Sequence, residues 1–412
     1  MVKEQIIGNN GLPLDTNFGA EFIRMLSSAK LIPSQAAKRW NIDQDHINDV
    51  MLGNIAPSQQ LEEAIKNSAP LNLGDLYSSE VKDKFPVVND TTDGVVVMHA
   101  TESDNTMRVL SRTSDTGVKF EVYDYADTAV SRVSESTIIP ERIWEKIIVD
   151  KYFSEKAPRW SFNQGHFEQQ MTYFIGKITA YWKDSNEKIH HVNMNTGDME
   201  YHVPFVPHLF TKRDDEEALI LAVTFRGELG TRDFLNSIKD MSEEDYMDKV
   251  REQLSKINTE QLNTGKVGFF AKHFKDANNF SEGVYKVRKL LNDIPFQQDT
   301  LGLEYTVPAN SKNIGEHDIK VDVERWGYVF GNSSVKLSWP GHEEILKQNS
   351  SFFIKPGIPH SLRSVDEKEG QVLIMQVKPK QENPWNTLAL ILHYAGEEGV
   401  KRARRETKQW TQ

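Results

Sequence analysis

The sequence predicts an α+β protein in which two helical blocks alternate with two blocks of antiparallel strands. Apolar side chains recur at helical spacing over residues 15–80 and again over 231–298. Residues 81–228 and 301–380 instead contain short runs rich in valine, threonine and aromatic residues, separated by turn residues. Both strand-rich blocks contain the pattern Pro-x-x-Pro-His before a strand, at 204–208 and 356–360. This recurrence indicates an internal duplication.

Length and composition limit the class of protein. The chain has 412 residues, of which 38% are hydrophobic and 26% charged, as in globular proteins that bury a core. Its net charge of −11 argues against a general nucleic-acid binder. The absence of cysteine excludes disulfides, zinc ribbons, iron–sulfur clusters and cysteine nucleophiles. Any metal must therefore be held by histidine, carboxylate, amide or water.

The sequence contains no signal for export or membrane insertion. The first 21 residues hold no apolar stretch of signal-peptide length, and no run approaches the ~20 apolar residues that span a bilayer. We therefore expect a cytoplasmic protein with no membrane partner.

The N-terminal block has the rhythm of a helix-turn-helix. Pro33 lies where a second helix should begin, Asn41 and Ile42 suggest a turn, and a third helix is expected from Asp43. The apolar positions that support these helices are Phe22, Ile23, Leu26, Ala36, Ala37, Trp40, Ile47, Val50 and Met51.

The first strand-rich block contains a candidate metal site. His166, Glu168 and Gln170 alternate along a predicted strand and would share one face, while His202 and His208 follow downstream. In a small barrel such residues can converge on one interior metal, as they do in cupins. Two imidazoles and one oxygen donor suit a non-haem Fe(II) site with open positions. The alternative is that these histidines pack in the core or in turns.

The second strand-rich block lacks a comparable donor set. Glu324, Arg325 and Trp326 stand where a cupin His-x-His would be, and only His360 remains. We therefore expect a non-catalytic second copy. The predicted domains are a helix-turn-helix-like domain (15–80), a metal-binding cupin (81–228), a helical segment or degenerate second helical module (229–298), a second cupin (299–385), and a C-terminal helix with a basic tail (386–412).

These motifs together resemble the phosphonate oxygenases, which include 2-hydroxyethylphosphonate dioxygenase, methylphosphonate synthase and hydroxypropylphosphonate epoxidase. The resemblance covers nearly the whole chain. It includes the N-terminal helix-turn-helix, Asn163-x-Gly165-His166, the closing Pro207-His208, the degraded second cupin (double-stranded β-helix) and the tail KRARRETKQW.

The resemblance implies that His166 and His208 ligate iron, while the third ligand separates the branches of the family. The dioxygenases have a glutamate six residues before the second histidine, where this chain has His202. The synthases have a glutamine four residues after the first histidine, which is Gln170 here. Both differences favour the synthase branch. His202 remains an alternative or additional ligand.

The resemblance also implies how the phosphonate is held. Tyr123 and Asn163 match the family's tyrosine and asparagine, and Lys30 matches a lysine delivered from the helix-turn-helix, with Lys30 and Tyr123 also expected to act in catalysis. Arg112 or Arg108 would add a further positive charge. We expect a dimer or tetramer in which Lys30 is supplied by the neighbouring subunit.

The activity implied is Fe(II)- and O2-dependent cleavage of the C–C bond of 2-hydroxyethylphosphonate, giving methylphosphonate and CO2. The enzyme alternative is the dioxygenase reaction, which gives hydroxymethylphosphonate and formate. No 2-oxoglutarate, flavin or nicotinamide is expected, and no dinucleotide-binding glycine motif is present.

Two alternatives come from other classes. The first is a transcription regulator with a cupin sensor. Asp43, Asp45 and Asp49 in its presumed recognition helix would repel phosphates, so we expect no DNA partner. The second is a structural protein with two cupins and no metal.

Overall fold

The computed structural model describes residues 18–69, 72–77, 85, 89–113, 117–134, 139–146, 162–184, 186–225, 229, 234, 237–257, 268–291, 300–309, 319–377 and 384–409. The chain divides into two units. One consists of residues 1–90, 131–133 and 407–412, and the other of residues 91–130 and 134–406.

The described residues of the first unit form four short helices and a 3-10 turn: α1 (Phe18–Ser28), α2 (Pro33–Trp40), α3 (Gln44–Met51), α4 (Gln59–Ser68) and η1 (Leu73–Leu76). Pro33 opens α2, where its missing N–H is not needed, and Asn41 ends that helix in the left-handed conformation at φ 52°. The Asp43 carboxylate caps α3 by accepting from the Asp45 amide. The predicted helix order is therefore confirmed for the described part of residues 15–80.

The apolar faces of these helices pack into a core of their own. Phe22, Ile47 and Val50 are among its most buried side chains. These positions belong to the helical pattern of the sequence, so burial of one face accounts for helices too short to be stable alone.

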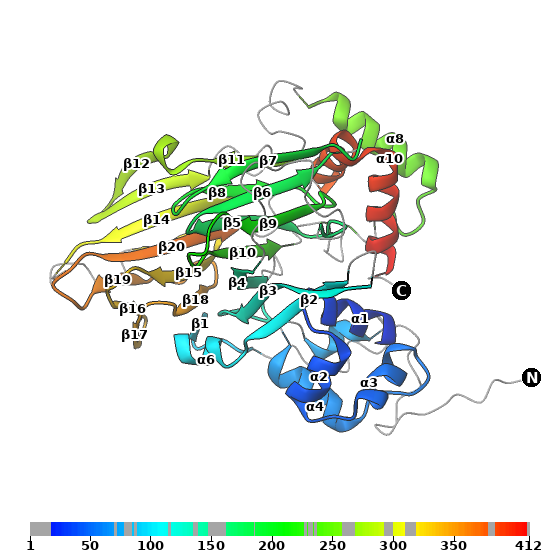
Figure 1. The fold of residues 1–412 in the computed structure, drawn as a ribbon, viewed down its shortest axis with the longest axis horizontal. Coiled ribbons are helices and arrows are strands. Elements are labelled where there is room, and N and C mark those ends of the chain that lie inside the picture. The colour runs from blue at the N-terminus through cyan, green and yellow to red at the C-terminus, as the bar shows by residue number, and fades with distance from the viewer. Residues whose placement is uncertain are drawn as a thin grey trace, which may run out of the picture. The chain divides into compact units, whose positions relative to one another are not determined.

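The second unit contains two β-barrels that follow the same plan (Figure 1). The first barrel has a seven-stranded sheet in the order β11-β8-β5-β10-β4-β3-β2 and a three-stranded sheet in the order β7-β6-β9. Its strands are β2 (Arg108–Thr113), β3 (Lys119–Asp127), β4 (Ile139–Glu145), β5 (Gln169–Ile175), β6 (Ile178–Lys183), β7 (Ile189–Met194), β8 (Met199–His202), β9 (His208–Lys212), β10 (Leu219–Phe225) and β11 (Phe269–Lys272).

The second barrel has a seven-stranded sheet in the order β1-β18-β15-β20-β14-β13-β12 and a three-stranded sheet in the order β17-β16-β19. Its strands are β1 (Val95–Met98), β12 (Asn278–Glu282), β13 (Tyr285–Leu291), β14 (Leu301–Val307), β15 (Glu324–Phe330), β16 (Val335–Trp339), β17 (His342–Leu346), β18 (Ser351–Ile354), β19 (Ser361–Ser364) and β20 (Gly370–Val377).

The two barrels exchange their first strands. β1 comes directly before the other strands of the first barrel in the chain, but it pairs with β18 of the second barrel. β11 comes directly before the other strands of the second barrel, but it pairs with β8 of the first. The exchange ties the two barrels together through main-chain hydrogen bonds as well as through shared core residues. The barrels are thus a structural duplication, as the repeated proline and histidine pattern predicts.

The duplication extends to single residues. The Tyr123 hydroxyl of β3 bonds both the amide and the carbonyl of Phe210 in β9, and the Tyr285 hydroxyl of β13 bonds both groups of Leu362 in β19. Gln170 pairs with His202 six residues before His208, and Arg325 pairs with Ile354 six residues before His360. Gln170 and Arg325 therefore occupy equivalent positions, as do His202 and Ile354.

The helical prediction for residues 229–298 is wrong in its second half. Within that range the structure describes α8 (Glu243–Ser255), but it then places β11, β12, the 3-10 turn η4 (Phe274–Asp276) and β13. In β13 the buried Tyr285 and Val287 alternate with the exposed Lys286 and half-buried Arg288, which is a period of two. Pairing with β12 and β14 overrides the weak helical spacing of this segment.

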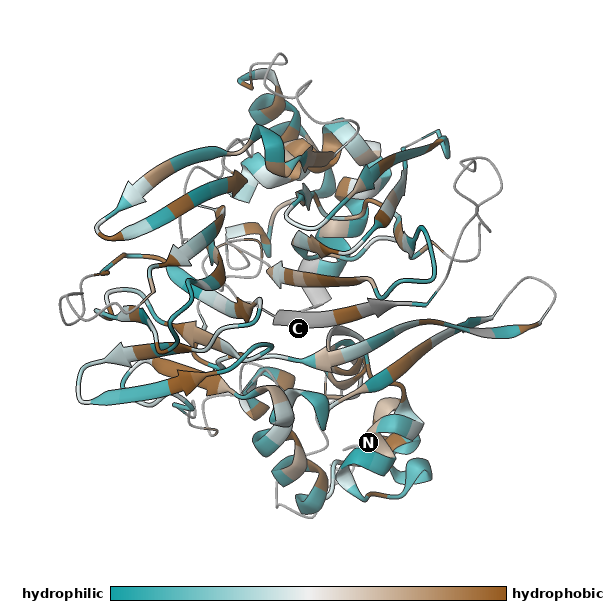
Figure 2. Cartoon of the chain, turned by 60° about the vertical axis from the view of Figure 1, so that its left-hand side comes forward, coloured by the Kyte–Doolittle hydropathy of each residue, from teal (hydrophilic) through white to brown (hydrophobic). Residues whose placement is uncertain are grey.

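In the part of the second unit that the structure describes there are also α6 (Ala100–Asp104) and most of α10 (Pro384–Gln409). The backbone of α10 leaves helical geometry at Gly396, where φ is 67°. Apolar and polar segments alternate along many strands and helices, as expected for elements with one buried face (Figure 2). Among the helices that the structure describes, none is long and apolar enough to cross a membrane.

Candidate metal centre

The loop before β5 presents His166 to the interior of the first barrel. Gly165 adopts φ 69°, and a Cβ atom there would lie 2.4 Å from the carbonyl carbon of Phe205, so this position requires glycine. The Phe205 amide donates to the His166 carbonyl at 2.9 Å. His166 and Glu168 thus lie in a loop, rather than on the strand that the alternating pattern suggests, and β5 begins at Gln169.

Two side chains fix this loop. The Asn163 Oδ1 accepts from the amides of Gly165 (3.0 Å) and His208 (2.9 Å), which joins the loop to the start of β9. Arg402 of α10 donates to the carbonyls of Gln164 (2.8 Å) and Gly165 (3.0 Å). Its guanidinium also lies 4.4 Å from the centre of the Phe205 ring. The basic tail therefore helps to hold the segment that carries His166.

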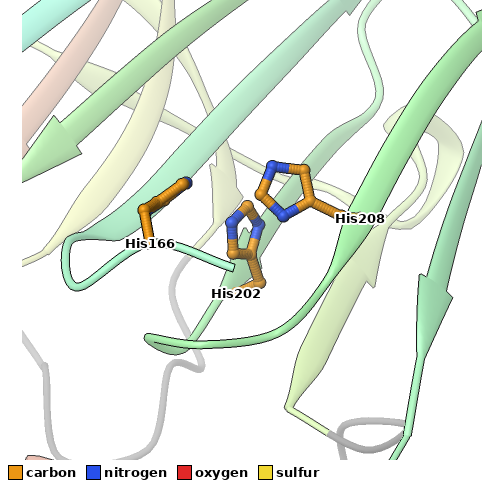
Figure 3. A group of neighbouring side chains, drawn as sticks. All are labelled: His166, His202 and His208. Carbon is orange, nitrogen blue, oxygen red and sulfur yellow. The ribbon is translucent and has the colours of Figure 1, made fainter. Parts of the chain in front are cut away.

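His166, His202 and His208 come together inside the first barrel (Figure 3). One ring nitrogen from each lies within 4.8 Å of the others, and the ring centroids are 4.2 to 5.5 Å apart. His202 ends β8 and His208 begins β9, so strand pairing delivers both rings beside the loop that carries His166. Within the described residues, this is the one group of histidines and carboxylates arranged to hold a metal ion.

Each ring has an acceptor at Nδ1, so Nε2 is the atom that remains for a metal. His166 Nδ1 lies 2.8 Å from the Glu168 carbonyl, His208 Nδ1 2.9 Å from the Val206 carbonyl, and His202 Nδ1 3.1 Å from the carboxylate of Glu200. With Nδ1–H donating in all three, each Nε2 carries the lone pair that a metal would bind. The Nε2 of His202 is buried and has no hydrogen-bond partner.

Burial keeps the His208 ring neutral. Its pKa is held well below the ordinary histidine value by desolvation, and then by the neighbouring His202 and His166 rings. A neutral imidazole is the form that binds a metal.

Gln170 brings an oxygen to the same place. Its Nε2 donates to the Thr172 hydroxyl at 2.8 Å, which turns Oε1 toward His166 Nε2 at 3.2 Å. Because Gln170 Oε1 and His166 Nε2 both carry lone pairs, a cation bound to both atoms would stabilise their approach. The donor set is thus three imidazole nitrogens and one carboxamide oxygen, which fits a divalent transition metal such as Fe(II).

The residues expected to bind phosphonate have different surroundings. Arg108 is paired with the Asp127 carboxylate at 2.7 Å. Arg112 lies 5.8 Å from the centre of the Tyr123 ring, its buried Nη1 has no hydrogen-bond partner, and its charge lowers the pKa of His208. Of the two arginines, Arg112 is therefore the one available to an anion beside the histidines.

Asn163 and Tyr123 lie at the first barrel, but both already have partners. The Asn163 Nδ2 is 2.8 Å from His208 Nε2. The Tyr123 hydroxyl is bonded to the Phe210 backbone, in the same way as Tyr285 in the barrel that lacks the histidine group. Tyr123 therefore has a structural role that both barrels share, whatever it adds in the first.

Lys30 belongs to the helical unit. It lies in the turn between α1 and α2 with φ 51°, and its amide donates to the Ser27 carbonyl. Its contact with a substrate stays a prediction.

Sequence reasoning missed two residues of this site. Glu200 and Arg402 were not singled out, although Glu200 and His202 alternate in the segment MEYH and so share a strand face. The contact of Arg402 depends on how α10 packs, and it has no local signal in the sequence.

No family model matches the chain. Over an alignment of 461 positions that covers 95% of both proteins, the chain is 26% identical to methylphosphonate synthase of Nitrosopumilus maritimus (strain SCM1). The predicted resemblance is confirmed. The fold is also that of 2-hydroxyethylphosphonate dioxygenase of Streptomyces albus, solved with 2-hydroxyethylphosphonate and Fe(II) bound. That structure superimposes with a TM-score of 0.59 at 22% identity, and the match covers 90% of this chain and 94% of the other.

A second solved structure, native PhpD with cadmium atoms, matches with a TM-score of 0.55 at 14% identity. It covers 95% of this chain and 100% of the other. At these identities the two solved structures establish the shared fold.

Proposed function

We propose that this chain is an Fe(II)-dependent oxygenase that converts 2-hydroxyethylphosphonate to methylphosphonate. The observation that carries the proposal is the group of His166, His202 and His208, in a chain similar over 95% of its length to methylphosphonate synthase. We assign iron to these three histidines, with Gln170 Oε1 as a further ligand. Iron bound there would supply open coordination positions and one-electron chemistry toward O2.

The residues of the first barrel suit the substrate of the proposed reaction. Arg112 offers a fixed positive charge and a buried donor for a phosphonate oxygen, and Asn163 offers an amide next to His208. A substrate contact by Tyr123 would exchange one of its bonds to the Phe210 backbone. The burial of His202 and His208 limits access of water, which strengthens these interactions.

The product depends on the ligands around the metal. The neutral Gln170 favours methylphosphonate, as the resemblance implies, and hydroxymethylphosphonate is the alternative product. His202 differs from the ligand sets of both branches, so the product ratio is the sharpest test of this proposal.

The DNA-binding alternative finds little support. Asp43 caps α3, and Asp49 accepts from the Asn54 side chain, so these carboxylates serve the local fold of the presumed recognition helix. They still repel a phosphate backbone. The helical unit is better explained as the carrier of Lys30.

We further propose O2 as co-substrate, a homo-oligomer that shares Lys30 between subunits, and a cytoplasmic location. Mixing a Lys30→Ala chain with a His166→Ala chain tests the sharing. Restored activity requires Lys30 and the metal site to come from different subunits, whereas no activity in the mixed oligomer would refute it. Fractionation of cells tests the location.

Phosphorus NMR of the reaction of iron-loaded protein with 2-hydroxyethylphosphonate and air tests the function. Methylphosphonate is the expected product, and unreacted substrate would refute the proposal. His208→Ala should abolish turnover. His360→Ala is the matched control, because both rings are buried and the Nδ1 of each lies 2.9 Å from the backbone carbonyl oxygen two residues earlier. His360→Ala should keep turnover, since the second barrel has no equivalent of His166 or His202.

A further inference from the structure

A buried carboxylate lies behind the histidine group. Glu200 is 0% exposed, and its oxygens lie 3.1 and 3.3 Å from Nδ1 of His202. No lysine or arginine of the described residues forms an ion pair with it. Because burying an unpaired carboxylate is strongly unfavourable, a residue of this kind calls for a reason beyond packing.

The fold itself does not require a carboxylate at this position. Glu200 pairs across β5 and β8 with Thr172, and in the second barrel the equivalent pair is Phe352 and Gly327. The neighbouring pair, His202 with Gln170, is replaced there by Ile354 with Arg325. The barrel without the histidine group thus fills the position of Glu200 with an aromatic ring, so the carboxylate accompanies the candidate metal site.

The geometry gives Glu200 a specific effect on His202. By accepting from Nδ1–H, the carboxylate fixes the tautomer in which Nε2 carries the lone pair, and it fixes the orientation of the ring. That Nε2 is buried, has no hydrogen-bond partner and belongs to the group formed with His166 and His208.

Glu200 also changes the charge of the site. Three neutral imidazoles leave the full double charge of a divalent ion without an anionic ligand. A carboxylate bonded to one of these rings offsets part of that charge from behind the ligand. The site would then have the same formal net charge as one built from two histidines and one carboxylate ligand.

We propose that Glu200 is a positioning residue that makes His202 a ligand of the metal, by holding its Nδ1–H and by supplying negative charge behind the ring. This inference rests on the proposed iron site. To the three histidines and Gln170 it adds a fifth side chain, which determines metal affinity without touching the metal.

The test is a titration of metal-free protein with Co(II), followed by its visible absorption, and an anaerobic competition with Fe(II). Glu200→Gln keeps the shape and an acceptor oxygen but removes the charge, and it should raise the dissociation constant about 10- to 100-fold. The unfolding temperature of the metal-free variant should equal or exceed that of the wild type, because a buried charge has been removed. A lower unfolding temperature with unchanged metal affinity would overturn the proposal.

The control is Glu62→Gln in the helical unit, which alters a buried carboxylate that accepts from the Tyr77 hydroxyl. It should leave the Co(II) affinity and spectrum unchanged. If Glu200→Gln does not fold, Glu200→Asp keeps the charge but shortens the side chain, and it should also weaken binding. Wild-type affinity in that variant would contradict the role of the Nδ1 contact.

A double variant separates positioning from a general electrostatic effect. In a His202→Ala background, Glu200→Gln should change metal affinity no further, because Glu200 acts through that ring. An undiminished effect there would overturn the proposal. The proposed iron site fails separately if wild type and His208→Ala bind Co(II) equally, whereas this inference alone fails if wild type binds tightly and Glu200→Gln binds equally well.

Discussion

Gly165 offers the sharpest test of how the fold builds the site, because its replacement should damage both stability and metal binding. In Gly165→Ala the new Cβ would lie 2.4 to 2.6 Å from three backbone atoms of Phe205, and the residue would keep φ 69°. The left-handed conformation costs an alanine about 1–2 kcal/mol. The overlap with a rigid backbone adds about 1–3 kcal/mol, as overpacking usually does. We therefore expect a loss of about 2–5 kcal/mol.

Gly341→Ala is the matched control, because Gly341 has φ 79° but nothing within 4 Å of its virtual Cβ. It should lose only the conformational cost of about 1–2 kcal/mol. Urea unfolding of the metal-free proteins, followed by tryptophan fluorescence, gives both free energies, and Co(II) titration gives the affinities. Gly165→Ala should also bind Co(II) more weakly, since relief of the overlap moves His166. Equal losses in the two variants, or unchanged affinity in Gly165→Ala, would refute the reasoning.

Three other predictions concern the two barrels and the metal site. Tyr123→Phe and Tyr285→Phe should each lower the free energy of unfolding by about 1–3 kcal/mol through loss of their bonds to the backbone, measured by urea unfolding. A loss of turnover in Tyr123→Phe far beyond its loss of stability would support the predicted substrate contact. Arg402→Gln should weaken Co(II) binding several-fold and speed hydrogen exchange of the amides in the loop before β5. Exchange as slow as in the wild type would contradict the role of Arg402 in holding this loop. Removing the metal with a chelator should lower the unfolding temperature of iron-loaded wild type, because metal present at 100 times its dissociation constant stabilises the fold by about 2.7 kcal/mol. The unfolding temperature of His208→Ala should not change on chelation.

Local patterns in the sequence predicted much of the fold. Helical spacing and the positions of Pro33, Asn41 and Asp43 fixed the order of the first helices, because capping and backbone preferences act within a few residues. The repeated proline and histidine pattern predicted two related barrels. It did so because equivalent turns need equivalent residues, and the bonds of Tyr123 and Tyr285 repeat the same relation in the structure.

Other features could not be predicted in this way. The strand exchange of β1 and β11 depends on pairing between segments far apart in the chain. The segment 285–291 has weak helical spacing, but as β13 it pairs on both sides with β12 and β14. Such pairings are decided by the partners that the fold supplies, so propensity over a short window is a poor guide to them.

The sequence by itself identified the candidate ligands His166, Gln170 and His208, with His202 as an alternative, and an overall resemblance to the phosphonate oxygenases. Tertiary structure decided how they meet. Strand register sets His202 opposite Gln170 and Glu200 opposite Thr172. Among the described residues, the buried Glu200 carboxylate pairs with the His202 ring and with no lysine or arginine. Residue type and spacing specify what a side chain can bind. Which side chains share one buried volume is set by the packing of strands that are distant in the chain, and no local pattern contains that information.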